Sequence, residues 1–339
     1  MSENNLNNSH NSYKSYECTG LALDPIHVGT GGSRLGRVDN TIIRDPVTKI
    51  PKIPGSSLAG VLRAYVAMAE GKYPDCAGQG QPKENGSKGH CGEKNCPVCT
   101  TFGFANKNNT GFAGLAGFSD ISVLLFPVAT REGPLWITAP SALRQVEGLE
   151  ALNVQDGNSV YRINCTEKDP INLGWLMLPV KEWKALNGNN DDSNISNKLN
   201  ELSIPEHVKN SIAMVSDKLF SHIINSNLEV RTSVAINPAT GSAEDGALFS
   251  YEALPRGTIL HWTVTCRNPS HFKIGKEKIT AASDPDSVFE NVKKAFPYLE
   301  HLGIGGMGNR GMGRLRVLKP AVLENECKSV ASNSLEAGN

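Results

Sequence analysis

Apolar and polar residues alternate in several segments of the chain, a pattern typical of half-buried β-strands. In other segments the apolar residues recur every three or four positions, which predicts amphipathic helices. The predicted strands cover residues 15–23, 122–130, 134–140, 228–236, 259–267 and 314–318, and the predicted helices cover 56–71, 205–223 and 283–297. The order of strand, helix, strands, helix and strand is that of a ferredoxin-like (RRM-like) α+β unit with long insertions.

The first and last predicted helices carry recognisable end signals. Ser56 or Ser57 can act as the N-cap of the first helix, and Gly71 supplies its stop. In the last helix, which begins near Ser283, Pro285 suits the first turn. The apolar face of the first helix consists of Leu58, Val61, Leu62, Tyr65, Val66 and Ala69.

Polar segments divide the chain into one domain with insertions and two tails. Residues 187–200 are rich in Asn, Asp and Ser, so we expect a surface insertion or the tip of a protruding hairpin there. The predicted organisation is a disordered polar tail at 1–15, one domain at 16–319, insertions at about 72–111 and 184–204, and a polar tail at 320–339.

Composition indicates a globular protein. The 339 residues are 39% hydrophobic and 20% charged, and no apolar run approaches the roughly 20 residues of a membrane span. The N-terminal segment lacks the apolar core of a signal peptide, so we expect a cytoplasmic protein. Lys and Arg number 34, as do Asp and Glu, so the net charge is zero. Any function in nucleic acid binding must therefore depend on local clusters of cations.

Two such clusters are present, and both are rich in glycine. Between Ser33 and Arg63 there are six Lys or Arg residues and two acids, Asp39 and Asp45. Between His301 and Lys319 there are four Lys or Arg residues and no acid. Because nucleic acids are polyanions, this clustering favours contact with a phosphate backbone.

The glycine loops do not fit the common nucleotide-binding motifs. The segment "GTGGSRLG" (29–36) lacks the Gly-Lys-Ser/Thr of a Walker loop. The segment "GIGGMG" in 303–313 fits G-x-G-x-x-G but follows a helix instead of a strand, so it is not a Rossmann loop. We expect its backbone amides to approach a phosphodiester chain, and the alternative is a basic surface turn.

The start of the first predicted helix adds a further candidate anion site. Its N-terminal end carries partial positive charge, and Arg63 lies two turns further on. The alternative is an ordinary cap with a solvated Arg63. The candidate RNA-binding residues are Arg34, Arg37, Arg44, Ser56, Ser57, Arg63, Gly305, Gly306, Met307, Arg310 and Arg314.

The eight cysteines divide into scattered and clustered residues. Three of them fall in apolar segments or predicted strands and are expected in the core, and one lies in the C-terminal tail: these are Cys18, Cys165, Cys266 and Cys327. The other four lie in a loop that includes "HCGEKNCPVC", and this spacing predicts a structural zinc site. The expected ligands are Cys76, Cys91, Cys96 and Cys99, with His90 as the substitute for Cys76 or Cys91. The alternative is a loop of reduced thiols that bind no metal.

The combination of these motifs resembles the RAMP superfamily of CRISPR proteins. The relevant segments are "HVGTG", "VDNTIIRDPVTKIPKIPGSSLAGVLR", a C-x4-C-x2-C followed by "FG", and the late glycine-rich loop. Residues 119–143, 215–236 and 246–262 resemble, more narrowly, the repeated backbone subunit of the Cmr-type (type III-B) RNA-targeting effector. The "VDNTIIRDP" loop and the cysteines are also similar to the equivalent Csm-type (type III-A) subunit.

The resemblance implies a backbone subunit of a CRISPR ribonucleoprotein. Such subunits assemble along guide RNA with copies of themselves and other type III effector subunits, and they displace a base at regular intervals with a protruding hairpin. They cut base-paired target RNA beside each displaced base with a loop aspartate and a divalent cation, Mg²⁺ or Mn²⁺. That aspartate matches Asp39. The resemblance also matches His27 and Glu252 as supporting groups, with Glu244 as a competitor for the last role.

Simpler roles exist for each of these three residues. Asp39 could be a turn residue paired with Arg37 or Arg44, although a carboxylate among arginines should stay ionised and favour metal binding. His27 could be a hydrogen-bonded loop histidine, and Glu252 could pair with Arg256.

The sequence therefore predicts a metal-dependent endoribonuclease subunit. The alternative from a different class is a non-catalytic scaffold that binds guide RNA. A third interpretation is a guide-processing ribonuclease acting alone, for which only His27 offers an acid–base group.

Overall fold

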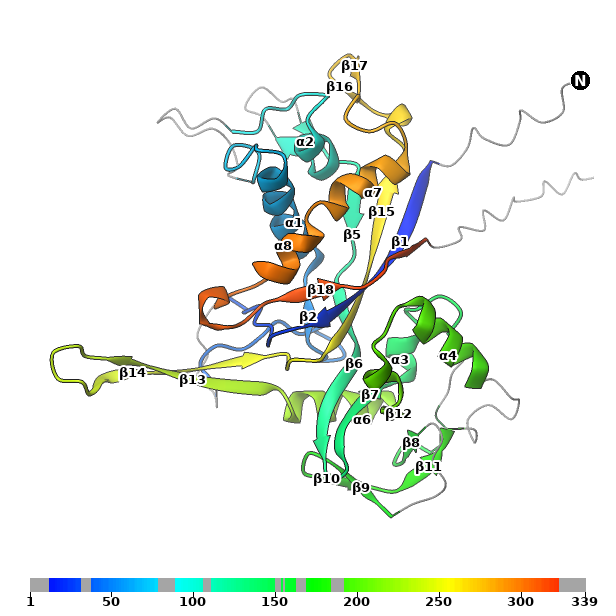
Figure 1. Cartoon of the computed structure of the whole chain (residues 1–339), viewed down its shortest axis with the longest axis vertical. Coiled ribbons are helices and arrows are strands. Elements are labelled where there is room, and N and C mark those ends of the chain that lie inside the picture. The colour runs from blue at the N-terminus through cyan, green and yellow to red at the C-terminus, as the bar shows by residue number, and fades with distance from the viewer. Residues whose placement is uncertain are drawn as a thin grey trace, which may run out of the picture.

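The computed structural model describes residues 12–31, 38–78, 89–105, 111–149, 154, 156–162, 169–183 and 192–322. These residues form an elongated body of strands and helices, from which one long hairpin projects (Figure 1). The fold is a mixed α+β arrangement, as predicted.

The body is built on an 11-stranded sheet that runs along its long axis. Its centre is a pair of long antiparallel strands, β1 (Tyr13–Ala22) and β15 (Ile259–Arg267). β18 (Leu315–Val317) pairs with the free side of β1, and β6 (Ile121–Thr130) pairs with the free side of β15. β7 (Gly133–Thr138) returns beside β6. These five strands confirm the alternating segments predicted from the sequence.

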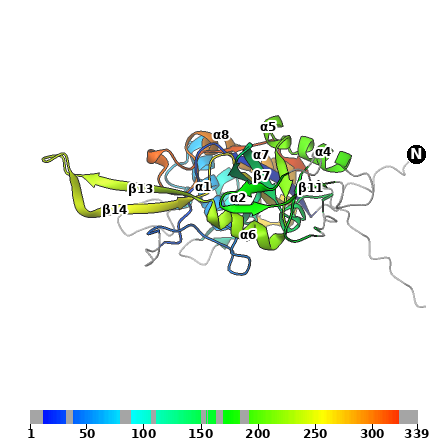
Figure 2. The same ribbon diagram turned by 90° about the horizontal axis from the view of Figure 1, so that it is seen from below.

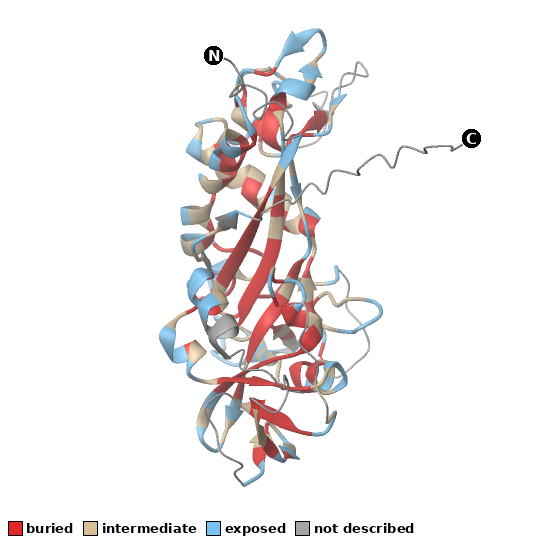
Figure 3. Cartoon of the chain, turned by 90° about the vertical axis from the view of Figure 1, so that its right-hand side faces the viewer, coloured by how far each residue is buried: buried red, intermediate tan, exposed pale blue. Residues whose placement is uncertain are grey.

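Three helices cover one face of the central strands (Figure 1). They are α1 (Gly55–Ala69), α7 (Pro285–Lys293) and α8 (Phe296–His301). Figure 3 shows the buried residues concentrated along the strands, with exposed residues on the outer surfaces of the helices. The predicted apolar face of the first helix is confirmed at its centre, because Leu58 and Leu62 are fully buried.

The structure corrects the last predicted helix, which is two helices. Asp284 caps α7 through a capping box with Ser287, one residue after the predicted start. α7 ends at Lys293, and α8 begins with Pro297 in its first turn. Because proline has no N–H and its ring clashes with the preceding turn, α7 cannot continue through Pro297.

A smaller lobe below the central strands buries a second apolar cluster. The predicted helix over 205–223 is wrong in this lobe. The chain forms α5 (Glu206–Lys209), then β12 (Ile212–Met214), then α6 (Asp217–Ser226), which Ser216 caps. All three residues of β12 are buried, and a strand covered on both faces reads as a continuous apolar run that periodicity cannot distinguish from a helix.

The polar segment 187–200 is not a hairpin tip in the part that the structure describes. Residues 192–200 belong to α4 (Asp192–Glu201), so the hairpin-tip alternative is wrong for them, while the surface insertion stays a prediction. Lys198 of α4 reaches the buried carboxylate of Glu17, with 3.7 Å between Nζ and Oε2. Glu17 also accepts a 3.0 Å hydrogen bond from His261. Burial alone would raise the pKa of Glu17, but His261, Lys198 and the Glu147 amide together lower it.

The protruding hairpin lies elsewhere in the chain. β13 (Glu229–Ile236) was expected, and β14 (Ala243–Ala253) is its antiparallel partner. Figure 2 shows the two strands extending well beyond the body. The hairpin carries four exposed apolar side chains: Val230, Val234, Ile236 and Leu248. An isolated two-stranded hairpin is marginally stable in water, so this exposed apolar surface indicates a binding partner.

None of the helices in the described residues is long and apolar enough to cross a membrane. β1 begins at Tyr13, inside the predicted tail, and the division into one domain with insertions stays a prediction. The other bounds are β2 (Lys52–Ile53), α2 (Pro97–Phe102), β3 (Phe104–Ala105), β4 (Gly111–Phe112), β5 (Ala116–Phe118), α3 (Pro140–Leu143), β8 (Val160–Arg162), β9 (Ile171–Leu173), β10 (Leu176–Leu178), β11 (Val180–Glu182), the 3-10 helices at Pro269–His271 and Gly308–Arg310, β16 (Lys273–Ile274), β17 (Glu277–Lys278) and β19 (Ala321–Val322).

Candidate functional site

Segments far apart in the sequence meet where the hairpin joins the body. The loop that contains Asn40 runs parallel to β14: its amide donates to the Ser250 carbonyl over 3.0 Å, and its carbonyl accepts from the Glu252 amide over 2.9 Å. On the other side of the root, Ile26 and Leu254 exchange two backbone hydrogen bonds of 2.9 Å. These contacts bring His27, Asp39 and Glu252 to one place.

Asp39 lies exposed at this junction. Its Oδ2 accepts hydrogen bonds from the Ser250 N–H, over 2.8 Å, and from the Ser250 hydroxyl, over 2.9 Å. These two donors, the backbone amide first, hold the pKa of the Asp39 carboxyl below its usual value. The carboxylate is therefore ionised near neutral pH and open to solvent, which suits metal binding.

Arg44 pairs with Glu252 and not with Asp39. The distance from Arg44 Nη2 to Glu252 Oε2 is 2.9 Å, and Arg44 Nε donates to Asn225 on α6 over 2.8 Å. The same Glu252 oxygen accepts a hydrogen bond from the amide of Ile42. Two simpler predictions are thus wrong, the pairing of Asp39 with Arg44 and the pairing of Glu252 with Arg256. Arg34 and Arg37 lie outside the described residues.

His27 is buried behind this junction, with 7% of its surface exposed. Its Nδ1 donates to the Glu252 carbonyl over 2.6 Å, which places the proton on that nitrogen, and its ring packs edge-on against Tyr251. The Gly306 amide donates to the His27 carbonyl over 2.9 Å. His27 therefore connects the hairpin root with the late glycine-rich loop.

The glycine-rich loop is held in an unusual backbone conformation. Gly305 has φ of +90°, and a Cβ there would lie 2.3 Å from the carbonyl oxygen of His27. Met307 is left-handed, with φ of 64°, a conformation that costs energy for a residue with a side chain. Beside it, a cavity of about 170 Å³ opens between Arg231 and Arg310. Candidates Gly305, Gly306, Met307 and Arg310 thus lie together next to the hairpin root.

Two other candidate arginines have internal partners. Arg314 forms a bidentate pair with Asp24, at 2.5 and 3.0 Å. Arg63 donates to the carbonyls of Cys76 and Gly103 and to Nδ1 of His90, over 2.7 to 2.8 Å. Arg63 therefore fixes the cysteine loop against α1, and it is not the solvated residue that the sequence alternative describes.

The start of α1 differs from the prediction. The helix begins at Gly55, its N-cap is Pro54, and no side chain caps it, so neither Ser56 nor Ser57 is the N-cap. Instead the Gly55 amide donates to Oδ1 of Asp120 over 2.8 Å, so a carboxylate of the chain already lies at the predicted anion site.

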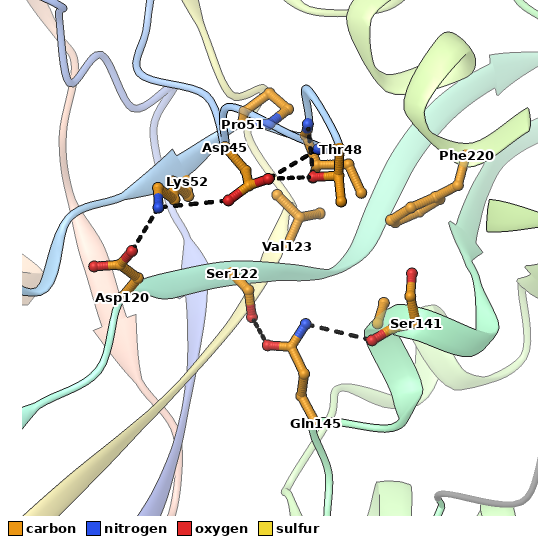
Figure 4. A pocket seen from close by; sticks show the side chains of 12 residues that line it. Asp45, Thr48, Pro51, Lys52, Asp120, Ser122, Val123, Ser141, Gln145 and Phe220 are labelled. Carbon is orange, nitrogen blue, oxygen red and sulfur yellow. Dashed lines mark hydrogen bonds and ion pairs between the residues drawn. The ribbon is translucent and has the colours of Figure 1, made fainter. Parts of the chain in front are cut away.

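Asp120 belongs to a cavity of about 300 Å³ between the loop that precedes α1 and β6 (Figure 4). Lys52 lies between two acids there, 2.7 Å from Asp120 and 3.7 Å from Asp45. One cation and two carboxylates leave a net negative charge there, so this cavity is not suited to an anion.

The four predicted cysteine ligands come together. The Sγ atoms of Cys76, Cys91, Cys96 and Cys99 all lie within 4.8 Å of one another, which makes a candidate metal site. Hydrogen bonds from the Cys99 thiol and amide lower the pKa of the Cys96 thiol, which favours the thiolate form that binds a metal ion. His90 accepts from Arg63 instead of joining the cluster. Cys18 and Cys266 are buried, as predicted, while Cys165 and Cys327 lie outside the described residues.

Comparison with known proteins identifies the family. The family model described as the RAMP superfamily matches residues 21–316. The chain belongs to the RAMP superfamily. This match covers β6, β7, β15, the hairpin, the cysteine cluster and the glycine-rich loop, so the site lies within the matched region.

Individual relatives point in the same direction. The chain is 26% identical to the CRISPR system Cmr endoribonuclease Cmr4 of Pyrococcus furiosus, over 73% of this chain and 80% of that protein. It is 35% identical to the CRISPR system Cms endoribonuclease Csm3 of Methanothermobacter thermautotrophicus, over 27% of this chain and 34% of that protein. The crystal structure of oligomeric Cmr4 from Pyrococcus furiosus has the same fold, with a TM-score of 0.56, 20% identity, and coverage of 93% of this chain and 100% of that one.

Sequence reasoning missed the partners of its candidate residues. Ser250, Asp24 and Asn225 each contact a candidate from a distant part of the chain, and the pattern around them carries no sign of that contact. Glu244, the competitor of Glu252, lies near the far end of β14, away from Asp39.

The close approach of the glycine-rich loop to His27 can be tested. We expect Gly305→Ala to lower the free energy of unfolding by about 1–3 kcal/mol more than Gly241→Ala, because the new methyl group overlaps the His27 carbonyl. Gly241 also has positive φ, +68°, but open space around it, so it controls for backbone strain. Chemical denaturation of both variants measures the difference, and equal losses would contradict the close approach.

Proposed function

We propose that this chain is the repeated backbone subunit of a type III CRISPR ribonucleoprotein and that it cleaves base-paired target RNA. The observation that carries the proposal is Asp39, an exposed, ionised carboxylate fixed at the root of a protruding hairpin within a RAMP domain. The relatives named Cmr4 and Csm3 are both described as endoribonucleases. Guide RNA, copies of the same chain and other effector subunits are the proposed partners, in the cytoplasm.

The chemistry follows from the position of Asp39. RNA cleavage requires the 2′-hydroxyl in line with the scissile phosphorus, and displacement of a base distorts the backbone toward that geometry. A divalent ion held by Asp39, Mg²⁺ or Mn²⁺, would neutralise charge on the phosphate oxygens. One exposed carboxylate oxygen suits such an ion, because both ions prefer oxygen ligands.

The other two candidates of the junction have structural roles in this proposal. His27 is enclosed and donates to a backbone carbonyl, and Glu252 is committed to Arg44 and the Ile42 amide. Both groups hold the Asp39 loop against the hairpin instead of exchanging protons with RNA. This arrangement also argues against a guide-processing ribonuclease that uses His27 as its acid–base group.

The proposed RNA contacts lie on two loops, the glycine-rich loop and the arginine-rich loop before Asp39. The phosphate backbone passes over the amides of Gly305, Gly306 and Met307, beside the exposed Arg310, and meets Arg34 and Arg37 of the loop. Three other arginines have partners within the chain and support the RNA-binding loops instead of contacting RNA. Glu252 binds Arg44, the cysteine loop binds Arg63, and Asp24 binds Arg314. Ser56 and Ser57 are peripheral contacts at most.

The β13–β14 hairpin is the proposed base-displacing element. Its four exposed apolar side chains can replace base stacking when a nucleotide is turned out. The hairpin root lies at Asp39, so a displaced base and the cut would lie next to each other.

The cysteine cluster is the proposed structural zinc site. Four thiol ligands form the closed tetrahedral set of a structural zinc, with no open position for a substrate. The metal would hold the loop that follows α1, which has little apolar core of its own.

The central strands form the proposed ferredoxin-like core. The spatial order β6, β15, β1, β18, with α1 after β1 and with α7 and α8 before β18, is the order of that motif. The second lobe, the cysteine loop and the hairpin are then insertions into this core.

The proposed cleavage activity predicts a specific defect. In a reconstituted guide-loaded particle with Mg²⁺, Asp39→Asn should lower the cleavage rate of end-labelled target RNA by at least about 100-fold, with target binding retained. Asn keeps the shape and can still accept from Ser250. The control Asp45→Asn neutralises a nearby half-buried acid of the same loop, whose Oδ1 accepts from the Val47 and Thr48 amides as an Asn oxygen also can, and it should change the rate less than 3-fold. Cleavage that persists in Asp39→Asn would assign the chain to the non-catalytic scaffold alternative.

The hairpin assignment predicts a second, separable defect. Replacing Ile236 and Leu248 with Ser should reduce target cleavage about 10-fold without lowering the melting temperature, because both side chains are exposed. Met177→Ser removes an equally exposed apolar residue from β10 and serves as the control. Equal cleavage by both variants would exclude the hairpin as the displacing element.

The zinc assignment predicts one bound metal ion per chain. Elemental analysis of purified protein should find about one zinc, and Cys99→Ser should lose it and unfold at lower temperature. Cys327→Ser, in the C-terminal tail, should keep both the metal and the stability. The assignment would be contradicted if wild-type protein purified in the presence of zinc contained no metal and had the same melting temperature as Cys99→Ser.

A further inference from the structure

Asp39 and Ser250 form a closed set of three hydrogen bonds. The Ser250 N–H and hydroxyl both donate to Oδ2 of Asp39, and the Asp39 amide donates back to the Ser250 hydroxyl oxygen over 3.2 Å. The hydroxyl therefore acts once as donor and once as acceptor, which satisfies it. Both donors bind the same carboxylate oxygen, and no other residue in the described part of the chain donates a hydrogen bond to Oδ1.

The rest of the loop is fixed independently of that carboxylate. The backbone bridge at Asn40 and the Arg44–Glu252 pair hold the chain on β14, but neither contacts the Asp39 side chain. The rotation of the carboxylate is thus set by Ser250.

Ser250 also places the Asp39 carboxylate near an exposed apolar side chain of the hairpin. Residues two apart on a strand point to the same face, so Ser250 and the exposed Leu248 share one face of β14. At about 3.4 Å per residue, their positions along the strand differ by roughly 7 Å. In the proposed function β14 presents Leu248 to the displaced base. The same strand therefore holds the Asp39 carboxylate at a fixed, short distance from Leu248.

We propose that Ser250 is the positioning residue of target cleavage: it ties Oδ2 of Asp39 to β14 and leaves Oδ1 facing the metal ion and the RNA. This inference rests on the proposed function. The inference adds to the proposed function that one hydroxyl on the hairpin, that of Ser250, connects the base-displacing strand with the cleaving carboxylate. Glu252 and Arg44 hold the loop, and Ser250 orients the carboxylate.

Removing the hydroxyl has a defined consequence. Ser250→Ala keeps the backbone N–H bond but lets the carboxylate turn, and small misplacements of a reacting group cost up to about 100-fold in rate. We expect the single-turnover rate at saturating Mg²⁺ to fall about 10-fold to 100-fold, with target affinity unchanged. Ser250→Thr keeps the hydroxyl and should recover most of the rate.

A second measurement avoids both the metal and the reaction. Because the Ser250 donors lower the pKa of Asp39, loss of the hydroxyl should raise that pKa toward its ordinary value in the free chain. A carboxyl-carbon NMR titration of Asp-labelled protein reads this shift directly. Ser250→Thr should keep the low pKa.

The control is Ser226→Ala, which removes an exposed hydroxyl that donates to the His222 carbonyl at the end of α6. It should change neither the rate nor the Asp39 titration. Ser250→Ala that cleaves within 2-fold of wild type, or that leaves the Asp39 pKa unchanged, overturns the proposal. Loss of cleavage in Asp39→Asn with normal cleavage in Ser250→Ala refutes only the positioning role, whereas cleavage that persists in Asp39→Asn refutes the proposed function itself.

Discussion

The pairing of the 39–44 loop with strand β14 is the constraint on which the candidate site depends. It includes the ion pair of Arg44 and Glu252, whose side chains are only 24% and 14% exposed. Burial removes water from both charged groups, so an isolated buried ion pair often adds little to the free energy of unfolding. Here the Ile42 amide, the Ile42 carbonyl and Asn225 supply further hydrogen bonds, so each charge has several partners. The loop is thereby fixed well enough to present Asp39 without burying it.

This arrangement explains which site residues could be predicted from the sequence. A lone acid in a cationic loop and four cysteines at metal-ligand spacing are local patterns. The structure holds Asp39 exposed against β14 and brings the four cysteine Sγ atoms together. The roles of the arginines depend on partners far away in the chain: Glu252 lies 208 residues from Arg44. A count of nearby charges treats such an arginine as free for RNA. Ser250 was missed for the same reason.

The long strands of the main sheet were predictable although most of their residues are buried on both faces. β1 and β15 have ten and nine residues, long enough for their alternation to be recognised, and α1 repeats as expected. The fully buried β12 has only three residues, too few to show a period, so it reads as part of a helix. One strand of the hairpin was predicted and the other was not. β13 alternates and was expected, whereas β14 carries acids and glycine beside apolar residues and shows no clear period.

Helix α1 connects the two ends of the molecule that carry chemistry. Arg63 on this helix donates to the cysteine loop, and the Tyr65 hydroxyl donates to the Gly303 carbonyl over 2.6 Å, at the start of the glycine-rich loop. That loop in turn supports His27 and, through it, the backbone of β14. A series of direct contacts therefore runs from the cysteine loop through α1 and the glycine-rich loop to the hairpin root, so packing at the cysteine loop and support of the Asp39 loop depend on the same helix.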